Sequence, residues 1–305
     1  MYARYSYSAG SGVADILSDV VAILTGTTDK ATLSASCNQS STEIISDVVA
    51  GWTLHDVYAG TNQQCLKAPL ADDAATFKYL CIDLNSSGYL LPRVYETWDE
   101  INHDGTNMCY SSNSTSYNQK IDIASGGSLY IWASERFAMF ASQTSAGWAS
   151  SSYPGPSGIL ERTRYLPWDT PANGWPPFFW SNLGNANQGT FGYAPRIMKR
   201  DGSPLISNSA VYHPGSVCFN SLSVPVGSDQ KIPDGNDGSV IPAWPLMAHN
   251  VSHMPMMYGE VSSLCDIWAI PESMATTHDI LVMNGINYVV VRTNGVTDSM
   301  ILRKG

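Results

Sequence analysis

Charged side chains are scarce in this 305-residue chain, where Asp, Glu, Lys and Arg together make up 14%, against about 25% in an average globular protein. The net charge is −10 and no run of Lys and Arg occurs. Proteins that bind nucleic acid present a basic patch to the phosphates, so we expect no direct contact with nucleic acid. Ser, Thr, Asn and Gly take the place of charges, together with 16 Tyr and 9 Trp. This balance is typical of β-rich proteins.

Long hydrophobic runs and an export signal are missing as well. Nothing approaches the roughly 18 apolar residues that cross a bilayer, and the opening MYARYSYSAGSG lacks the basic and apolar regions of a signal peptide. We therefore expect synthesis in a cytoplasm and no membrane insertion. The cysteines form no CxxC pair, and we expect reduced, buried thiols rather than disulfides or zinc ligands. They are Cys37, Cys65, Cys81, Cys109, Cys218 and Cys265.

Signatures of catalysis and of cofactor binding are absent from the sequence. It contains no GxSxG, Walker A, dinucleotide-binding or HExxH motif. The HNVSH segment at 249–253 has the spacing of a zinc pair but lacks the Glu beside the first His. The PDGNDGS segment at 233–239 resembles the start of a calcium loop, but Pro245 stands where the bidentate Glu belongs. We predict no catalytic residue, no metal and no cofactor.

One group of carboxylates leaves an enzymatic alternative open. Glu96, Asp99, Glu100 and Asp104 surround Trp98 in YETWDEINHDG. Two carboxylates about 5–10 Å apart beside a sugar-stacking Trp would suffice for glycoside hydrolysis. Acidic residues near strand ends more often keep a loop soluble. A glycan-binding or glycan-hydrolysing module is therefore the alternative function.

Two N-terminal segments predict amphipathic helices packed on a shared surface. In the first, residues 13–24, apolar residues recur at helical spacing, with Ser11 as a candidate cap and Gly26 as the end. Residues 41–51 form the second, because IISDVVA at 44–50 echoes ILSDVVA at 16–22. The predicted apolar face of the first helix consists of Val13, Ile16, Leu17, Val20, Val21 and Leu24.

The rest of the chain is predicted to be β structure. From Trp52 to about Gln143, short apolar or alternating runs are separated by turn residues, including a hairpin connection at 85–88 and a tight turn at 125–127. At the C-terminus, Asn284-Gly285 separates two apolar β runs, the preferred sequence of a type I′ hairpin. A further Asn294-Gly295 turn completes a three-stranded meander.

These patterns predict a mainly β (α+β) fold. We expect an antiparallel β-sandwich or two small β domains, with an N-terminal pair of amphipathic helices and long ordered loops. The predicted regions are a helical region at 1–51, a β domain at 52–145, a long Pro/Gly/aromatic-rich loop region with assembly contacts at 146–245, and a C-terminal β meander at 246–305 that packs with 52–145.

The segment Glu161–Trp180 combines three Trp, two Phe, one Tyr and four Pro without a helical or strand period. Proline interrupts any regular ladder, and large aromatic side chains need burial. Either the segment lies on the core of its own domain or another protein surface covers it. In the second case, aromatic residues anchor the contact and arginines pair with carboxylates of a neighbouring subunit. The candidate interface residues are Arg162, Arg164, Trp168, Trp175, Phe178, Phe179 and Trp180.

Several phrases of the sequence resemble those of structural proteins from tailed-bacteriophage virions, in particular tail and tail-tip components. They are LTG at 24–26, AGW at 50–52, CLKAP, FKYLCIDL, YETWDE, GGSLYIWASERF, ERTRYLPWDTP and the hairpin around Asn284-Gly285. The resemblance implies a non-enzymatic component of the tail, tail-tip or baseplate.

A protein of this kind is made in the host cytoplasm, resides in the virion and has copies of itself and other tail or baseplate proteins as partners. A receptor-recognition module for host surface glycan and a capsid-associated decoration protein are the alternatives. The long repeats of β-helical tail-spike depolymerases are absent from the sequence.

Overall fold

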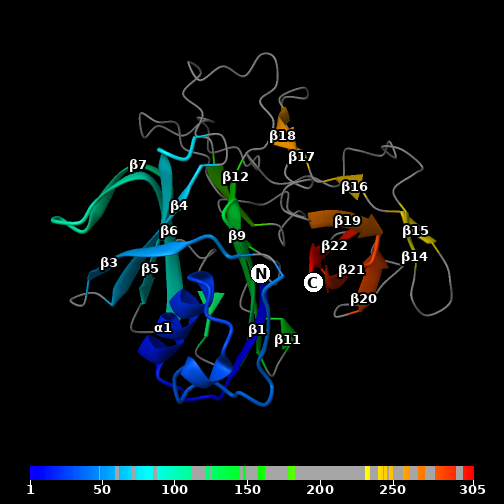
Figure 1. Ribbon diagram of the computed structural model, residues 1–305, viewed down its shortest axis with the longest axis horizontal. Helices are drawn as coiled ribbons and strands as arrows, with labels where there is room; N and C mark the ends of the chain where they lie inside the picture. Colours follow the sequence, from blue (N-terminus) through cyan, green and yellow to red (C-terminus); the bar gives the residue numbers. More distant parts are fainter. Residues whose placement is uncertain are drawn as a thin grey trace.

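The computed structural model shows a mainly β protein with antiparallel sheets, as the sequence predicts (Figure 1). The structure describes residues 1–47, 49–58, 62–70, 73–84, 88–111, 121–123, 126–144, 147–148, 157–161 and 178–182. Towards the C-terminus it describes residues 231–233, 240–242, 244–245, 247–249, 257–260, 267–271, 279–292 and 298–305.

The first large sheet is built around the N-terminal strand. Strand β1 lies between β2 and β9 and pairs antiparallel with both. Strand β9 forms a hairpin with β10, which pairs with β12, and β12 pairs with β13. The strands are β1 (Tyr2–Tyr7), β2 (Glu43–Ile45), β9 (Gly127–Ser134), β10 (Phe137–Thr144), β11 (Gly147–Trp148), β12 (Ser157–Glu161) and β13 (Phe178–Asn182). Regions 1–51 and 52–145 thus contribute neighbouring strands to one sheet.

The second large sheet is a meander in which each strand pairs with the next. Its order is β3-β4-β5-β6-β7, and β8 pairs with β6. The antiparallel pairing of β5 with β6 confirms the hairpin expected around residues 85–88. The strands are β3 (Thr53–Tyr58), β4 (Gln63–Pro69), β5 (Phe77–Leu84), β6 (Tyr89–Asp99), β7 (Asp104–Ser111) and β8 (Ile121–Asp122).

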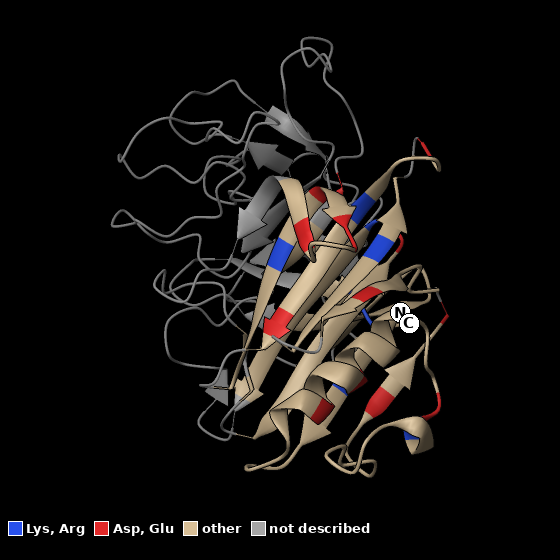
Figure 2. Ribbon diagram, turned by 90° about the vertical axis from the view of Figure 1, so that its left-hand side faces the viewer, with Lys and Arg blue, Asp and Glu red and all other residues tan. Residues whose placement is uncertain are grey.

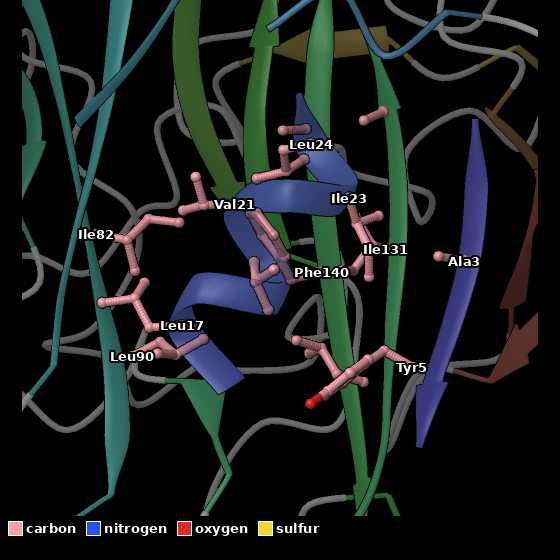
Figure 3. Close-up of a cluster of buried hydrophobic side chains, with 14 of the residues drawn as sticks. Ala3, Tyr5, Leu17, Val21, Ile23, Leu24, Ile82, Leu90, Ile131 and Phe140 are labelled. Atoms are coloured by element: carbon pink, nitrogen blue, oxygen red, sulfur yellow. The ribbon is translucent and has the colours of Figure 1, made fainter. Parts of the chain in front are cut away.

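Helix α1 (Val13–Leu24) joins the two sheets through one buried cluster. Figure 3 shows Leu17 near Leu90 of the second sheet, while Ile131 of the first sheet lies on the other side of the helix. Phe140 of the first sheet belongs to the same cluster. The helix has the bounds that its apolar spacing predicts. The backbone N–H groups of Gly26 and Thr27 close its end by donating to the carbonyls of Ile23 and Ala22.

Two details of α1 differ from the sequence expectation. The residue at the helix start is Gly12, and no side chain caps it there, so Ser11 does not act as the cap. Asp19 is buried although it lies beside the apolar stripe. Its carboxylate accepts hydrogen bonds from the Tyr5 hydroxyl at 2.7 Å and from the Ser34 backbone N–H at 2.8 Å. Burial, and then the contact with Asp19, raises the pKa of Tyr5.

A buried ion pair also joins the two sheets. Lys78 on β5 donates to Glu161 on β12 at 3.0 Å and to the carbonyl of Pro69 at 2.6 Å. Burial lowers the pKa of Lys78, and the charge of Glu161 opposes that shift. The Lys78 ammonium also lies 5.6 Å from the centre of the Trp52 ring, where a cation–π contact is favourable.

The predicted second helix is wrong. Within residues 41–51, Glu43–Ile45 form strand β2, and Val48 lies outside the described residues. This segment instead pairs with the edge of β1. The Ser6 backbone N–H donates to Thr42 Oγ1 at 3.0 Å, and the Ser6 hydroxyl donates to the Ser41 carbonyl. Tertiary pairing, together with the β-branched Ile44 and Ile45, overrides a helical pattern only two turns long. The other helical element described is the 3₁₀ helix η1 (Lys30–Thr32).

The expectation of reduced thiols is wrong for one pair. Cys65 on β4 and Cys81 on β5 are directly opposite and are joined by a disulfide. The spacing of cysteines along the sequence does not show this pairing, which depends on the strand register. Cys37 is a free, buried thiol, as the sequence predicts. Burial raises the pKa of this thiol. The side chains of Cys109, Cys218 and Cys265 lie outside the described part of the chain.

The C-terminal part contains a third, smaller sheet of order β16-β19-β22-β21-β20. Asn284 and Gly285 have φ of 51° and 79° and connect β20 to β21, which confirms the type I′ hairpin. The Asn294-Gly295 turn lies outside the described residues. The strands are β14 (Lys231–Pro233), β15 (Val240–Pro242), β16 (Trp244–Pro245), β17 (Met247–His249), β18 (Met257–Glu260), β19 (Ile267–Pro271), β20 (Ile280–Met283), β21 (Ile286–Arg292) and β22 (Asp298–Arg303).

The chain end lies against the N-terminal region. Arg303 pairs with Asp47 at 2.6 Å and Lys304 pairs with Glu43 at 3.2 Å. The first large sheet therefore contacts the end of the C-terminal meander through Glu43 of β2 and the adjoining Asp47. Among the described helices, none has the length and apolar character needed to span a membrane.

Candidate interaction surface

The outer edge of β3 and the turn between β6 and β7 bring polar, aromatic and exposed apolar side chains together on one surface. We call it the β3 surface and define it by Leu54, His55, Asp56, Val57, Tyr58, Trp98, Glu100, Ile101 and His103. Strand β3 is at one margin of the second sheet and pairs with β4 (Figure 1).

A β-bulge sets the directions of the β3 side chains. The register shifts between Leu54 and Asp56, so His55 is the extra residue of the strand. The extra residue interrupts the alternation of the strand, so the side chains beyond the bulge point to the opposite face from the one that regular alternation would give them. Leu54 is opposite Leu66, which belongs to the main core, whereas Asp56 is opposite Cys65, which belongs to a small aromatic cluster on the other face. The HD pair in WTLHDVYAG breaks the alternation of the strand and is the sequence signal for this bulge.

Asp56 is the polar centre of the surface. Its Oδ2 accepts a hydrogen bond from Trp98 Nε1 at 2.8 Å and lies 2.8 Å from His103 Nδ1. Burial alone would raise the pKa of Asp56, but hydrogen bonds from His103 and Trp98 outweigh it and leave the pKa below its ordinary value. The ring of His103 stacks on that of Tyr58, with centroids 4.2 Å apart. Asp56 thus fixes two rings that come from the β6–β7 hairpin.

His55 forms the second acid–base contact of the surface. Its Nδ1 lies 3.1 Å from Glu100 Oε1, and its ring contacts Tyr79. Burial and the neighbouring Lys67 lower the pKa of His55, against the opposing effect of Glu100. The imidazole is therefore largely neutral at neutral pH.

Apolar side chains surround these polar contacts. Ile101 is 89% exposed, Val57 52%, Leu54 47% and Tyr58 39%. Single exposed apolar residues are normal, but four of them along one strand edge and the adjoining turn indicate a surface that can be covered. In the view of Figure 2, basic and acidic residues are interspersed over the described strands rather than separated by sign.

The four acidic residues singled out in the sequence have separate surroundings. Asp99 accepts hydrogen bonds from the backbone of Ile101 and from Asn102, which closes the β6–β7 turn. Glu100 pairs with His55, and Asp104 accepts from the N–H of Gly105. Glu96 is half-buried on β6. Within the described residues, no group of three or more His, Cys, Asp or Glu side chains could hold a metal ion.

The predicted interface anchors lie mostly beyond the described residues. This holds for Arg162, Arg164, Trp168 and Trp175. Phe178, Phe179 and Trp180 belong to β13, where their backbone pairs with Glu161, Leu160 and Ile159 of β12. Their side chains are not among the described ones, so their role as anchors remains a prediction.

Sequence reasoning named Trp98 and Glu100 but missed the other residues that build the β3 surface. His55, Asp56 and Tyr58 come together with Trp98 and His103 only through the strand register and the bulge. The comparison with known proteins adds no assignment: no protein-family model matches this chain, and no curated protein sequence matches it.

Proposed function

We propose that this chain is a non-enzymatic structural component of a tailed-phage virion, in the tail, tail-tip or baseplate, and that it assembles as a homo-oligomer with other virion proteins. The observation that carries the proposal is the exposed apolar margin of β3, where Leu54, Val57 and Tyr58 follow one sheet edge. The resemblance of the sequence to tail proteins is the reason for choosing the tail, tail-tip or baseplate as the assembly.

Two further features suit an architectural role. The ion pair of Lys78 with Glu161 and the cluster around α1 bind the large sheets into one unit, and we propose that these sheets form the expected sandwich. The polar groups of the β3 surface are also largely engaged with one another. Such a surface is suited to contact with a partner of fixed shape.

Self-association is the first test of the proposal. Size-exclusion chromatography with light scattering, followed by negative-stain imaging, should show discrete oligomers such as rings. An antibody raised against the chain should then label the tail of the virion rather than its head. Strictly monomeric protein at high concentration would contradict the homo-oligomer, and labelling of the head would favour a capsid-associated decoration protein.

A glycan-binding module is the second candidate, and the ring stack of Tyr58 on His103 beside Trp98 favours it. Aromatic faces next to carboxylates are a common means of binding sugars. A glycan array would detect this activity, and Tyr58→Ala should abolish it if the stack is the platform. Binding that survives Tyr58→Ala would place the sugar elsewhere on the chain.

A further inference from the structure

We propose that the β3 surface is a homotypic interface in which β3 of one copy pairs antiparallel with β3 of a second copy. This inference rests on the proposed function, because it specifies how the homo-oligomer forms. The proposal is argued from β3 itself, which is an outer strand whose residues complement those of a second β3 in one antiparallel register.

The edge is available for pairing within the described part of the chain. Strand β3 is hydrogen-bonded to β4 on one side, and no described strand pairs with its other side. The six residues TLHDVY contain no Pro, so each residue keeps its backbone N–H and C=O groups, and those that point away from β4 can bond to a second strand. An edge of this kind gains main-chain hydrogen bonds when a second strand docks.

Side-chain complementarity selects one register. When β3 pairs with itself about a point between His55 and Asp56, Leu54 is opposite Val57 of the second copy. In the same register, His55 is opposite Asp56 and Thr53 is opposite Tyr58. Apolar residues thus meet apolar residues, and the imidazole meets a carboxylate. A shift of one residue in either direction sets His55 against His55 or Asp56 against Asp56, which is unfavourable.

The bulge makes this register geometrically possible. In a regular strand, Leu54 and Val57 would point to opposite faces, and residues opposite one another in a ladder must share a face. Because His55 is the extra residue, Leu54 and Val57 lie on the face of the main core. His55 contacts Tyr79 and Asp56 contacts Trp98, so both lie on the other face. The two central pairs of the proposed register, Leu54 with Val57 and His55 with Asp56, therefore each share a face.

Exposure agrees with the same arrangement. Leu54 and Val57 are about half exposed in the single copy, at 47% and 52%, and the pairing would cover both. The net charge of −10 repels two copies at long range. At the strand itself, the two-fold arrangement brings His55 towards Asp56 of the other copy rather than carboxylate towards carboxylate.

Cysteine cross-linking tests the register. Opposite residues of an antiparallel pair have Cα atoms about 4.5–5.5 Å apart, within disulfide range. Equivalent Leu54 residues would be separated by about 10 Å along the strand. We expect an equimolar mixture of Leu54→Cys and Val57→Cys proteins to form a disulfide-linked dimer under mild oxidation. Each variant alone should give no more than the wild-type background, and the doubly substituted chain should cross-link with itself.

Circular dichroism of both variants verifies that the fold is retained. Cross-linking of Leu54→Cys alone would indicate another register and overturn the proposal. So would the absence of cross-links in the mixture when the wild-type protein is an oligomer, although the proposed function would then stand. A wild-type protein that is monomeric in light scattering contradicts the proposed function itself.

Discussion

Lys78 Nζ lies 3.0 Å from Glu161 Oε2, and both side chains are almost completely buried between strands of different sheets. A buried ion pair adds little net stability compared with well-packed apolar residues, but removal of one partner leaves a charge that the interior cannot solvate. The pair therefore makes the contact between β5 and β12 specific.

Lys78→Met should lower the free energy of unfolding by about 3–5 kcal/mol, because the Glu161 carboxylate loses its ammonium partner. The double variant Lys78→Met/Glu161→Leu should recover much of that loss, since no uncompensated charge remains. Urea denaturation followed by circular dichroism measures both. Lys67→Met, on the neighbouring strand, is the control and should change stability by less than about 1 kcal/mol. Equal losses in the single and double variants would show that packing, not charge, accounts for the effect.

Asp19→Ala should destabilise the fold strongly, whereas Asp15→Ala on the same helix should not. Asp19 is buried and accepts from Tyr5 and Ser34, and each buried donor left without an acceptor costs about 1–3 kcal/mol. Asp15 is exposed, and its replacement should change the free energy of unfolding by no more than about 1 kcal/mol. Thermal unfolding of the two variants compares them directly. Similar melting temperatures would contradict the role assigned to the Asp19 carboxylate.

The Cys65–Cys81 disulfide should be present in purified, oxidised protein. Peptide mapping without reductant should recover a linked pair of peptides containing these two residues. Reduction should lower stability by about 3 kcal/mol, because the bond closes a loop with a sequence separation of 16 residues. Recovery of both cysteines as free thiols would contradict the assigned pairing.

Acidification should destabilise the protein through His55. Burial, and then Lys67, lowers the pKa of this residue from 6.5, so near that pH the unfolded chain binds a proton that the folded chain does not. Stability is therefore lost as pH falls through the unfolded pKa and continues to fall until the folded His55 titrates. His55→Gln should make the free energy of unfolding less dependent on pH between about 7 and 5.

Glu100→Gln is the matched variant for this titration, because the Glu100 charge raises the pKa of His55. Without that charge the pKa of the folded His55 falls further, so the loss of stability should extend to lower pH. An unchanged pH profile in both variants would show that His55 does not couple folding to protonation.

Local patterns predicted the elements that depend on local physics. The apolar spacing of α1 gave its bounds, and Asn284-Gly285 specified a turn whose positive φ values few other residues adopt. The segment at 44–50 has nearly the same letters as 16–22, yet it pairs with β1, since an open strand edge competes with a short helix. Sequence similarity between two segments therefore does not guarantee the same conformation.

Features that depend on strand register were beyond local prediction. Cys65 and Cys81 become neighbours only when β4 and β5 are aligned, and Lys78 meets Glu161 from another sheet. The acidic residues near Trp98 were identified, but Asp56, which binds the Trp98 indole, comes from a strand more than forty residues earlier. The sequence analysis did not predict the bulge at His55 and Asp56, although two adjacent polar residues interrupt the alternation of the strand there.

The central claim is that the margin of β3 holds copies of this chain together. Sedimentation velocity over a range of concentrations tests it most directly, with wild-type protein, Val57→Lys on β3, and Val282→Lys as the matched control, because Val282 is an exposed residue on β20, the outer strand of another sheet. We expect wild-type and Val282→Lys proteins to associate as concentration rises and Val57→Lys to remain monomeric. Association of Val57→Lys equal to that of the wild type would contradict the claim.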